Sequence, residues 1–176
     1  DPAREVTMTD IRCGDCLSIM PTLPENSVDS IITDLAAGIA AEHLVCADLL
    51  LSGYRAFLAD QNCPYDVAVE LDGHLIRIQV KGTRQPKKVP QRSHFQTAYQ
   101  FHTRRAGKHG KRRYADGEFD VLALVALDAR LIGYLPFVGV RDDVFIRVPG
   151  AKYGGKDNVG RQFADLTFQK AVSPYD

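Results

Sequence analysis

The chain has 176 residues, 45% of them hydrophobic and 25% charged, which suits one compact domain with a sizeable core, or a small domain with an appendage, rather than two enzymes. No apolar run is long enough to cross a membrane and no secretion signal opens the sequence, so we expect a cytoplasmic protein whose four cysteines are reduced thiols. The zero net charge hides an asymmetry, because thirteen acidic and three basic residues precede Arg77, whereas the stretch from Arg77 to Ala115 contains twelve basic residues and no acidic ones. Such a basic block is typical of nucleic-acid binding, and a solvated basic loop without a partner is the alternative.

The first half of the chain begins with the pattern of a βαβ unit and continues with a helix. The opening unit is expected as a strand at residues 11–12, a helical stretch at 16–20 and an apolar strand at 28–33. A longer helix is predicted at residues 37–51, where apolar residues recur at helical spacing until Ser52 and Gly53 end the pattern.

Three strands should follow this helix, at residues 54–58, 65–71 and 75–81. The last two flank Asp72 and Gly73, a dipeptide that strongly favours a two-residue hairpin turn. We therefore expect a helix followed by an antiparallel meander.

The basic block belongs to residues 82–117, which are rich in Lys, Arg, Gln, His and Gly. We expect a mobile arm or loop there, with at most a short helix at residues 94–102, and we expect Tyr99 and Phe101 to anchor the arm to the core rather than stack on bases. The remaining strands are predicted at residues 119–127, 131–135 and 144–148, followed by a polar, glycine-rich tail with one terminal strand at residues 165–168.

The hairpin brings three polar residues together. Because side chains alternate along a strand, Gln79 and Lys81 share one face, while Ile76, Ile78 and Val80 belong to the core face. Counting outward from the Asp72-Gly73 turn places Asp66 opposite Gln79. A carboxylate, an amide oxygen and an ammonium group should therefore converge at one end of the hairpin.

These groups suit a hard divalent cation such as Mg²⁺, which prefers oxygen ligands. Asp66 and the Gln79 side chain would supply two of them, and the Val80 carbonyl a third, while Lys81 would orient a water or stabilise charge on the scissile phosphate. The alternative is that Asp66 merely starts a strand and that Gln79 and Lys81 form the solvent face of an edge strand.

The run CPYDVAVELDGHLIRIQVKGT resembles the core of the PD-(D/E)XK nuclease superfamily, with Asp66 in the PD pair and Gln79-Val80-Lys81 in place of the (D/E)XK triplet. The preceding helix is similar to the first helix of that family, whose site glutamate matches Glu42. Within this superfamily, the sequence resembles the intron-associated homing endonucleases, which are similar to archaeal Holliday-junction resolvases and often carry QXK. This implies an α/β restriction-endonuclease-like core with a mixed central sheet flanked by helices, which we expect at residues 35–150, followed by a tail at 151–176.

The resemblance implies a DNA endonuclease that uses Mg²⁺, with Mn²⁺ as a substitute, and that is a homodimer or homotetramer so that two sites address two strands. A homing-type, site-specific enzyme is the first interpretation; a Holliday-junction resolvase and a catalytically weak DNA-binding module are the alternatives. Because Gln79 is neutral, the metal site has one negative charge fewer than a version with glutamate, and we expect cleavage to require Glu42. The expected DNA contacts are Arg84, Lys87, Lys88, Arg104, Arg105, Lys108, Lys111, Arg112 and Arg113.

Residues 8–34 look like the opening of a DNA amino-methyltransferase. The proline-rich catalytic tetrapeptide of those enzymes would follow Asp34, but Leu35-Ala36-Ala37-Gly38 stands there, and no glycine-rich loop for a methyl donor comes later. We therefore do not expect methylation, and we interpret residues 1–34 as a passenger fragment, continued in frame from an interrupted methyltransferase exon.

Overall fold

The computed structural model describes residues 35–60, 62–88, 97–107, 110–138, 140, 143–151 and 161–175. The chain divides into two units, Asp1–Thr33 and Asp34–Asp176, and all described residues belong to the second. The predicted βαβ opening and the methyltransferase-like fragment lie outside the described residues.

Helix α2 (Leu35–Leu51) is built mainly from Ala and Leu, which have high helix propensity. It ends in a Schellman motif, in which Gly53 has a φ of 89°, Gly53 N donates to Leu50 O and Tyr54 N donates to Leu49 O, both at 3.0 Å. The predicted helix and its termination at Gly53 are confirmed.

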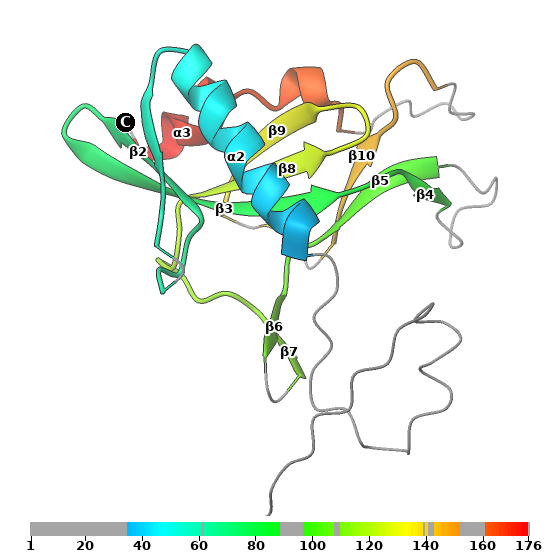
Figure 1. The fold of residues 1–176 in the computed structure, drawn as a ribbon, viewed down its shortest axis with the longest axis horizontal. Coiled ribbons are helices and arrows are strands. Elements are labelled where there is room, and N and C mark those ends of the chain that lie inside the picture. Colours follow the sequence, from blue (N-terminus) through cyan, green and yellow to red (C-terminus); the bar gives the residue numbers. More distant parts are fainter. Residues whose placement is uncertain are drawn as a thin grey trace, which may run out of the picture. The chain divides into compact units, whose positions relative to one another are not determined.

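The central sheet has five strands in the order β1-β2-β3-β8-β9 (Figure 1). Its members are β1 (Arg55–Leu58), β2 (Val67–Leu71), β3 (His74–Thr83), β8 (Val121–Ala126) and β9 (Leu131–Pro136). β3 and β8 run parallel and the other pairs are antiparallel, so the sheet is mixed, as predicted. All six residues of β8 are buried, which explains its uninterrupted apolar sequence.

The β2–β3 hairpin forms with the predicted turn. Asp72 (φ 49°) and Gly73 (φ 80°) both have positive φ, as a type I′ turn requires, and Leu71 pairs with His74 across them. β3 continues beyond its pairing with β2, and its second half, from Ile78 to Thr83, pairs with β8. β3 is therefore a central strand, and the alternative that its polar residues line an edge strand is wrong.

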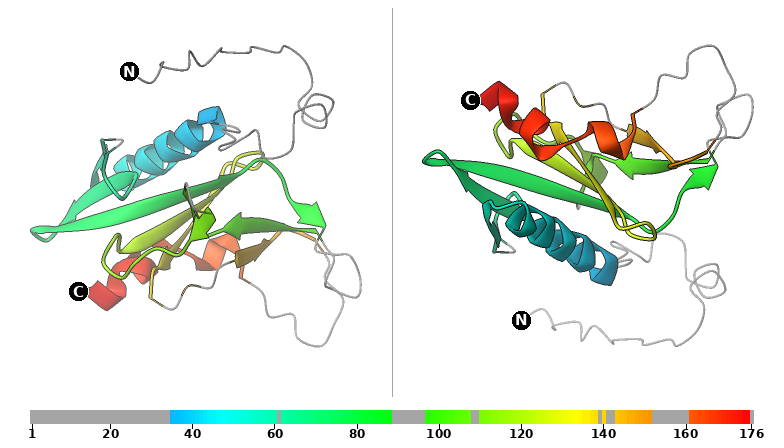
Figure 2. Two further views of the ribbon diagram at one scale, coloured as in Figure 1. Left: turned by 90° about the horizontal axis from the view of Figure 1, so that it is seen from below. Right: turned by 90° about the horizontal axis from the view of Figure 1, so that it is seen from above.

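Two hydrophobic cores cover the two faces of the sheet. On one face, α2 packs Ala41, Val45 and Leu49 against the buried residues of β2, β3 and β8. The other face is covered by a second, three-stranded sheet in the order β10-β5-β4, as both views of Figure 2 show. The predicted α/β layering is confirmed for the α2 face, whereas strands rather than helices cover much of the opposite face.

The prediction of an unstructured basic arm at residues 82–117 is wrong for the described part of that segment. It contributes β4 (Lys87–Lys88) and β5 (Thr97–His102), and β5 pairs antiparallel with β10 (Asp143–Arg147). The short helix expected at residues 94–102 is therefore replaced by a strand. Tyr99 and Phe101 are each 2% exposed, which confirms that they anchor the segment to the core.

The rest of the basic segment includes a two-stranded ribbon, β6 (Arg105–Gly107) and β7 (Gly110–Arg112), which extends away from the central sheet in Figure 1. At the C-terminal end, the strand predicted at residues 165–168 is wrong. The chain forms the 3₁₀ helix η2 (Phe163–Asp165), the helix α3 (Phe168–Val172) and the 3₁₀ helix η3 (Ser173–Tyr175), and Phe163 and Phe168 are buried. None of the helices in the described part of the chain has the length and hydropathy of a membrane span.

Candidate active site

Asp66 lies where β2 separates from β3. Its backbone N–H donates to Ile78 O at 2.9 Å, and its carboxylate Oδ2 accepts the backbone N–H of Val80 at 2.7 Å. The carboxylate thus takes the place that a backbone carbonyl would occupy in a continuous ladder. This contact fixes the carboxylate beside β3, next to the residue that the hairpin register predicted.

Gln79 is the cross-strand neighbour of this carboxylate. Its side-chain Nε2 donates to Asp66 Oδ2, and it also reaches Val80 O at 3.5 Å. Gln79 is only 7% exposed, so its amide is a buried polar group whose partners lie within the site. The predicted convergence of Asp66 and Gln79 is confirmed.

Glu42 reaches the same region from α2. Burial raises the pKa of Glu42, and the negative charge of Asp66 raises it further, while His43 and Lys81 lower it. The interactions with Asp66 and Lys81 show that helix and hairpin residues share one electrostatic environment. Glu42 therefore lies close enough to Asp66 and Lys81 for their charges to influence its pKa.

Gly82 allows the helix to come this close. A Cβ built on Gly82 would lie 3.0 Å from Ala41 Cβ and 3.6 Å from Ala37 O, both on α2. Ala41 directly precedes Glu42, so the absence of a side chain at Gly82 sets the distance between Glu42 and β3. Sequence reasoning missed this glycine, whose role depends on a contact between distant segments.

Lys81 continues the strand on the Gln79 face. Its Nζ donates to the Tyr114 hydroxyl at 2.7 Å and lies 5.1 Å from the centre of the Tyr114 ring. Tyr114 was not predicted, because its only sequence signal is an aromatic residue at the end of a basic run. The structure thus adds one contact residue to the predicted site.

The donor set fits a hard divalent cation. The carboxylates of Asp66 and Glu42, the amide of Gln79 and the carbonyl of Val80 offer oxygen donors, and the Val80 carbonyl shares the side of β3 on which its N–H meets Asp66. Within the described ranges, no group of three or more His, Cys, Asp or Glu side chains could hold a metal ion. Two of the four oxygen donors, the Gln79 amide and the Val80 carbonyl, carry no negative charge.

The predicted DNA-contacting residues do not lie on one element. Lys87 and Lys88 are exposed on β4, and Arg84, Arg104 and Arg113 are exposed in the connections between strands. Three others occupy the β6–β7 ribbon, namely Arg105, Lys111 and Arg112. Lys108 lies outside the described residues.

Comparison with known proteins identifies the family of the chain. No curated protein matches the chain. Among solved structures, the fold is similar to that of a bacterial homing endonuclease, I-Ssp6803I, with a TM-score of 0.55 and 15% identity over 82% of this chain and 99% of that chain, which confirms the predicted restriction-endonuclease-like architecture. The sequence model of the PD-(D/E)XK endonucleases matches residues 34–164, more than half of the chain, including α2 and the whole β2–β3 hairpin. The chain belongs to the PD-(D/E)XK endonuclease family, whose members hydrolyse phosphodiester bonds of DNA with the help of divalent metal.

Proposed function

We propose that the protein is a Mg²⁺-dependent, site-specific DNA endonuclease of the homing type. The observation that carries this proposal is that Asp66, which directly precedes β2, meets Gln79 and Val80 of β3 close to Lys81 and to Glu42 of α2. The fold neighbour is itself a homing endonuclease, which supports site-specific cleavage over the resolution of branched DNA.

In this proposal, Asp66, Gln79 and the Val80 carbonyl hold the cation, with Glu42 adding a second negative charge. The bound ion would neutralise charge on the phosphate and lower the pKa of a water molecule. In this structure Gln79 Nε2 faces the Asp66 carboxylate. Rotation of the Gln79 side-chain amide by 180° would exchange its nitrogen and oxygen, so that the amide oxygen could bind a cation held by Asp66. Mn²⁺, which also accepts oxygen ligands, should substitute for Mg²⁺.

Lys81 would interact with the scissile phosphate. An ammonium group has three N–H donors, and one of them is directed to Tyr114. The other two are available to stabilise a phosphate oxygen or to orient the attacking water. A bound cation would also offset the repulsion from Asp66, which adds to burial in raising the pKa of Glu42.

DNA would be bound by the basic residues of β4, of the β6–β7 ribbon and of the segments that flank it. Lys and Arg that neutralise phosphates release counterions, and a two-stranded antiparallel ribbon has the dimensions to enter a major groove. We further propose a symmetric dimer or tetramer, because one active site cuts one strand and two strands must be cut. Residues 1–34 are proposed to be dispensable for cleavage.

The direct test is cleavage of supercoiled plasmid libraries and of four-way junctions, with Mg²⁺ or with a chelator. Linear products with one defined end, only in Mg²⁺, are expected from wild type, and Asp66→Asn should abolish them. Asp72→Asn is the matched control, because Asp72 is an exposed turn residue with positive φ, which asparagine tolerates well. Symmetric nicking of junctions would replace the homing proposal with resolution, and salt-sensitive binding without any cleavage would replace it with a DNA-binding module.

A further inference from the structure

The contact between Lys81 and Tyr114 points to a role for Tyr114 that membership of the family does not supply. The phenol oxygen accepts a hydrogen bond of 2.7 Å from Lys81 Nζ, and the ammonium also lies 5.1 Å from the ring centre. A phenol hydroxyl can accept a hydrogen bond from an ammonium group and so orient it, without bringing the negative charge that a carboxylate in the same place would add.

The Tyr114 ring is held firmly by other aromatic rings. Its centre lies 4.9 Å from that of Phe119 and 6.2 Å from that of Phe137, both in edge-to-face geometry. Phe119 is 2% exposed and belongs to the core beneath the second sheet. Edge-to-face packing of this kind restricts the ring to one orientation, so the hydroxyl has a defined position.

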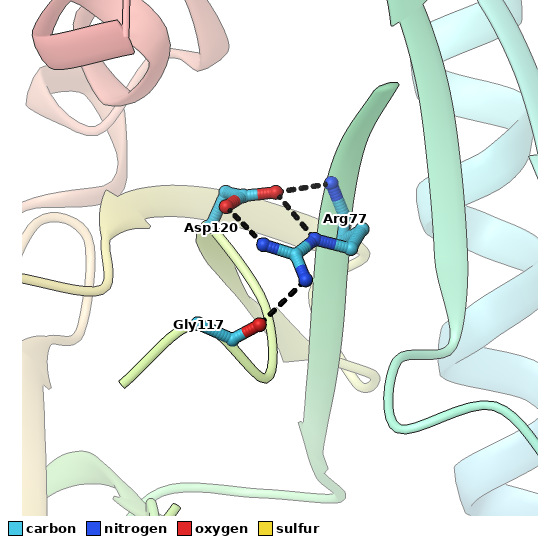
Figure 3. A network of polar contacts seen from close by, with 3 residues as sticks. All are labelled: Arg77, Gly117 and Asp120. Carbon is cyan, nitrogen blue, oxygen red and sulfur yellow. Dashed lines mark hydrogen bonds and ion pairs between the residues drawn. The ribbon is translucent and has the colours of Figure 1, made fainter. Parts of the chain in front are cut away.

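The segment that carries Tyr114 is also fastened to β3 itself. Figure 3 shows the Arg77 guanidinium of β3 donating to both carboxylate oxygens of Asp120, at 3.0 and 2.8 Å, and to Gly117 O at 2.5 Å. The backbone N–H of Arg77 donates to the same Asp120 carboxylate at 2.8 Å, and Asp120 N donates to Arg77 O at 2.9 Å. Arg77 and Lys81 are on the same strand, so this clamp fixes Tyr114 relative to the site.

We propose that Tyr114 is a positioning residue, which holds the Lys81 ammonium in the direction required for phosphate hydrolysis. The proposal rests on the function proposed above. It differs from a purely structural role, because packing needs only the ring, whereas positioning needs the hydroxyl. The Tyr114→Phe variant separates the two, since it keeps the ring and its aromatic contacts.

The first test does not require cleavage. The purified full-length protein is labelled with an amine-reactive ester, and the modification of Lys81 is followed by mass spectrometry, with exposed Lys87 as the internal reference. Without its hydrogen bond, Lys81 in Tyr114→Phe should react about threefold faster or more than in wild type, while Lys87 is unchanged. An unchanged Lys81-to-Lys87 ratio would overturn the proposal whether or not the protein cleaves DNA.

The second test uses the cleavage reaction. Tyr114→Phe should lower kcat about tenfold at unchanged KM and unfolding temperature, because a charge-assisted hydrogen bond that orients Lys81 is lost. Tyr99→Phe is the matched control, since its hydroxyl donates to Asp128 at 3.2 Å, and it should retain the wild-type kcat. Equal kcat for the two variants, or a loss in KM alone, would contradict the proposal; an inactive wild type would instead refute the proposed function and leave the labelling result to decide on Tyr114.

Discussion

The β2–β3 hairpin and the basic segment at residues 82–117 are neighbours in the chain but are held in different ways. The hairpin is local, because a two-residue turn sets its register and thereby places Asp66 beside Gln79. The basic segment depends on distant partners, since β5 pairs with β10, which follows β8 and β9 in the chain. The proposed chemistry therefore resides in a local motif, and the proposed DNA surface in a segment shaped by long-range contacts.

This difference predicts that variants near the hairpin change catalysis, whereas variants in the basic segment change DNA binding. After Asp66→Asn, the largest effect is expected from Glu42→Gln, which should lower cleavage about a hundredfold or more at low Mg²⁺, because it removes one of two negative charges at the proposed cation site. Cleavage rates over a Mg²⁺ titration test this. Full activity at low Mg²⁺ would show that Glu42 is not part of the site.

Glu42 also predicts a pH dependence. Burial and the Asp66 charge raise its pKa, so wild-type cleavage should require more Mg²⁺ as the pH falls toward this raised value.

A raised pKa of Glu42 in the folded state stabilises the fold at low pH, and this stabilisation is lost as the pH rises through the raised value. Without divalent cations at neutral pH, Glu42→Gln should therefore unfold at a higher temperature than wild type. Calorimetric scans at two pH values measure the difference in unfolding temperature between the variant and wild type. A lower unfolding temperature for the variant would contradict the raised pKa of Glu42.

Gly82→Ala should have the next largest effect. Its new Cβ would lie 3.0 Å from Ala41 Cβ, so α2 must shift and Glu42 with it. We expect cleavage to fall about tenfold and stability by about 1–2 kcal/mol, with DNA binding unchanged. The double variant Gly82→Ala with Ala41→Gly should recover part of both losses, and no recovery would mean that the contact with Ala41 is not the cause.

Lys87→Gln and Lys88→Gln together should weaken DNA binding several-fold without changing kcat, because both residues are exposed on β4. If each contacts one phosphate, the slope of log affinity against log salt should become smaller in magnitude by about two. Lys170→Gln is the control, as Lys170 lies on α3 and donates to Asp165 O. A change in kcat with an unchanged salt slope would break the distinction between the two regions.

The smallest effect is expected from deletion of residues 1–34, which include the whole of the separate unit Asp1–Thr33. Cleavage and unfolding temperature of the shortened protein should match those of the full chain if this fragment is a passenger. Loss of folding or cleavage would show that it has a function.

Features with local causes could be predicted from the sequence. The Gly53 helix end and the Asp72-Gly73 turn each follow from the conformational preferences of one or two residues. This turn determines which residues of β2 and β3 face each other, so the pairing of Asp66 with Gln79 follows from counting residues outward from it.

Features that depend on distant contacts could not be predicted in the same way. β5 contains buried Tyr99 and Phe101 within a polar, basic sequence, and its partner β10 lies far along the chain. Helix α3 is only five residues long, so its stability comes from packing of Phe168 rather than from its own propensity. Tyr114 was missed because its role is defined by its contact with Lys81 of β3, which lies 33 residues earlier in the chain.

Asp66 and Gln79 are proposed to form a divalent cation site of low negative charge. Calorimetric titration of Mg²⁺ into wild type, Gln79→Glu and Asp66→Asn tests it most directly. We expect weak binding by wild type, several-fold tighter binding by Gln79→Glu, because a carboxylate replaces the amide, and no measurable binding by Asp66→Asn. Equal Mg²⁺ affinity for wild type and Asp66→Asn would contradict the assignment of this site.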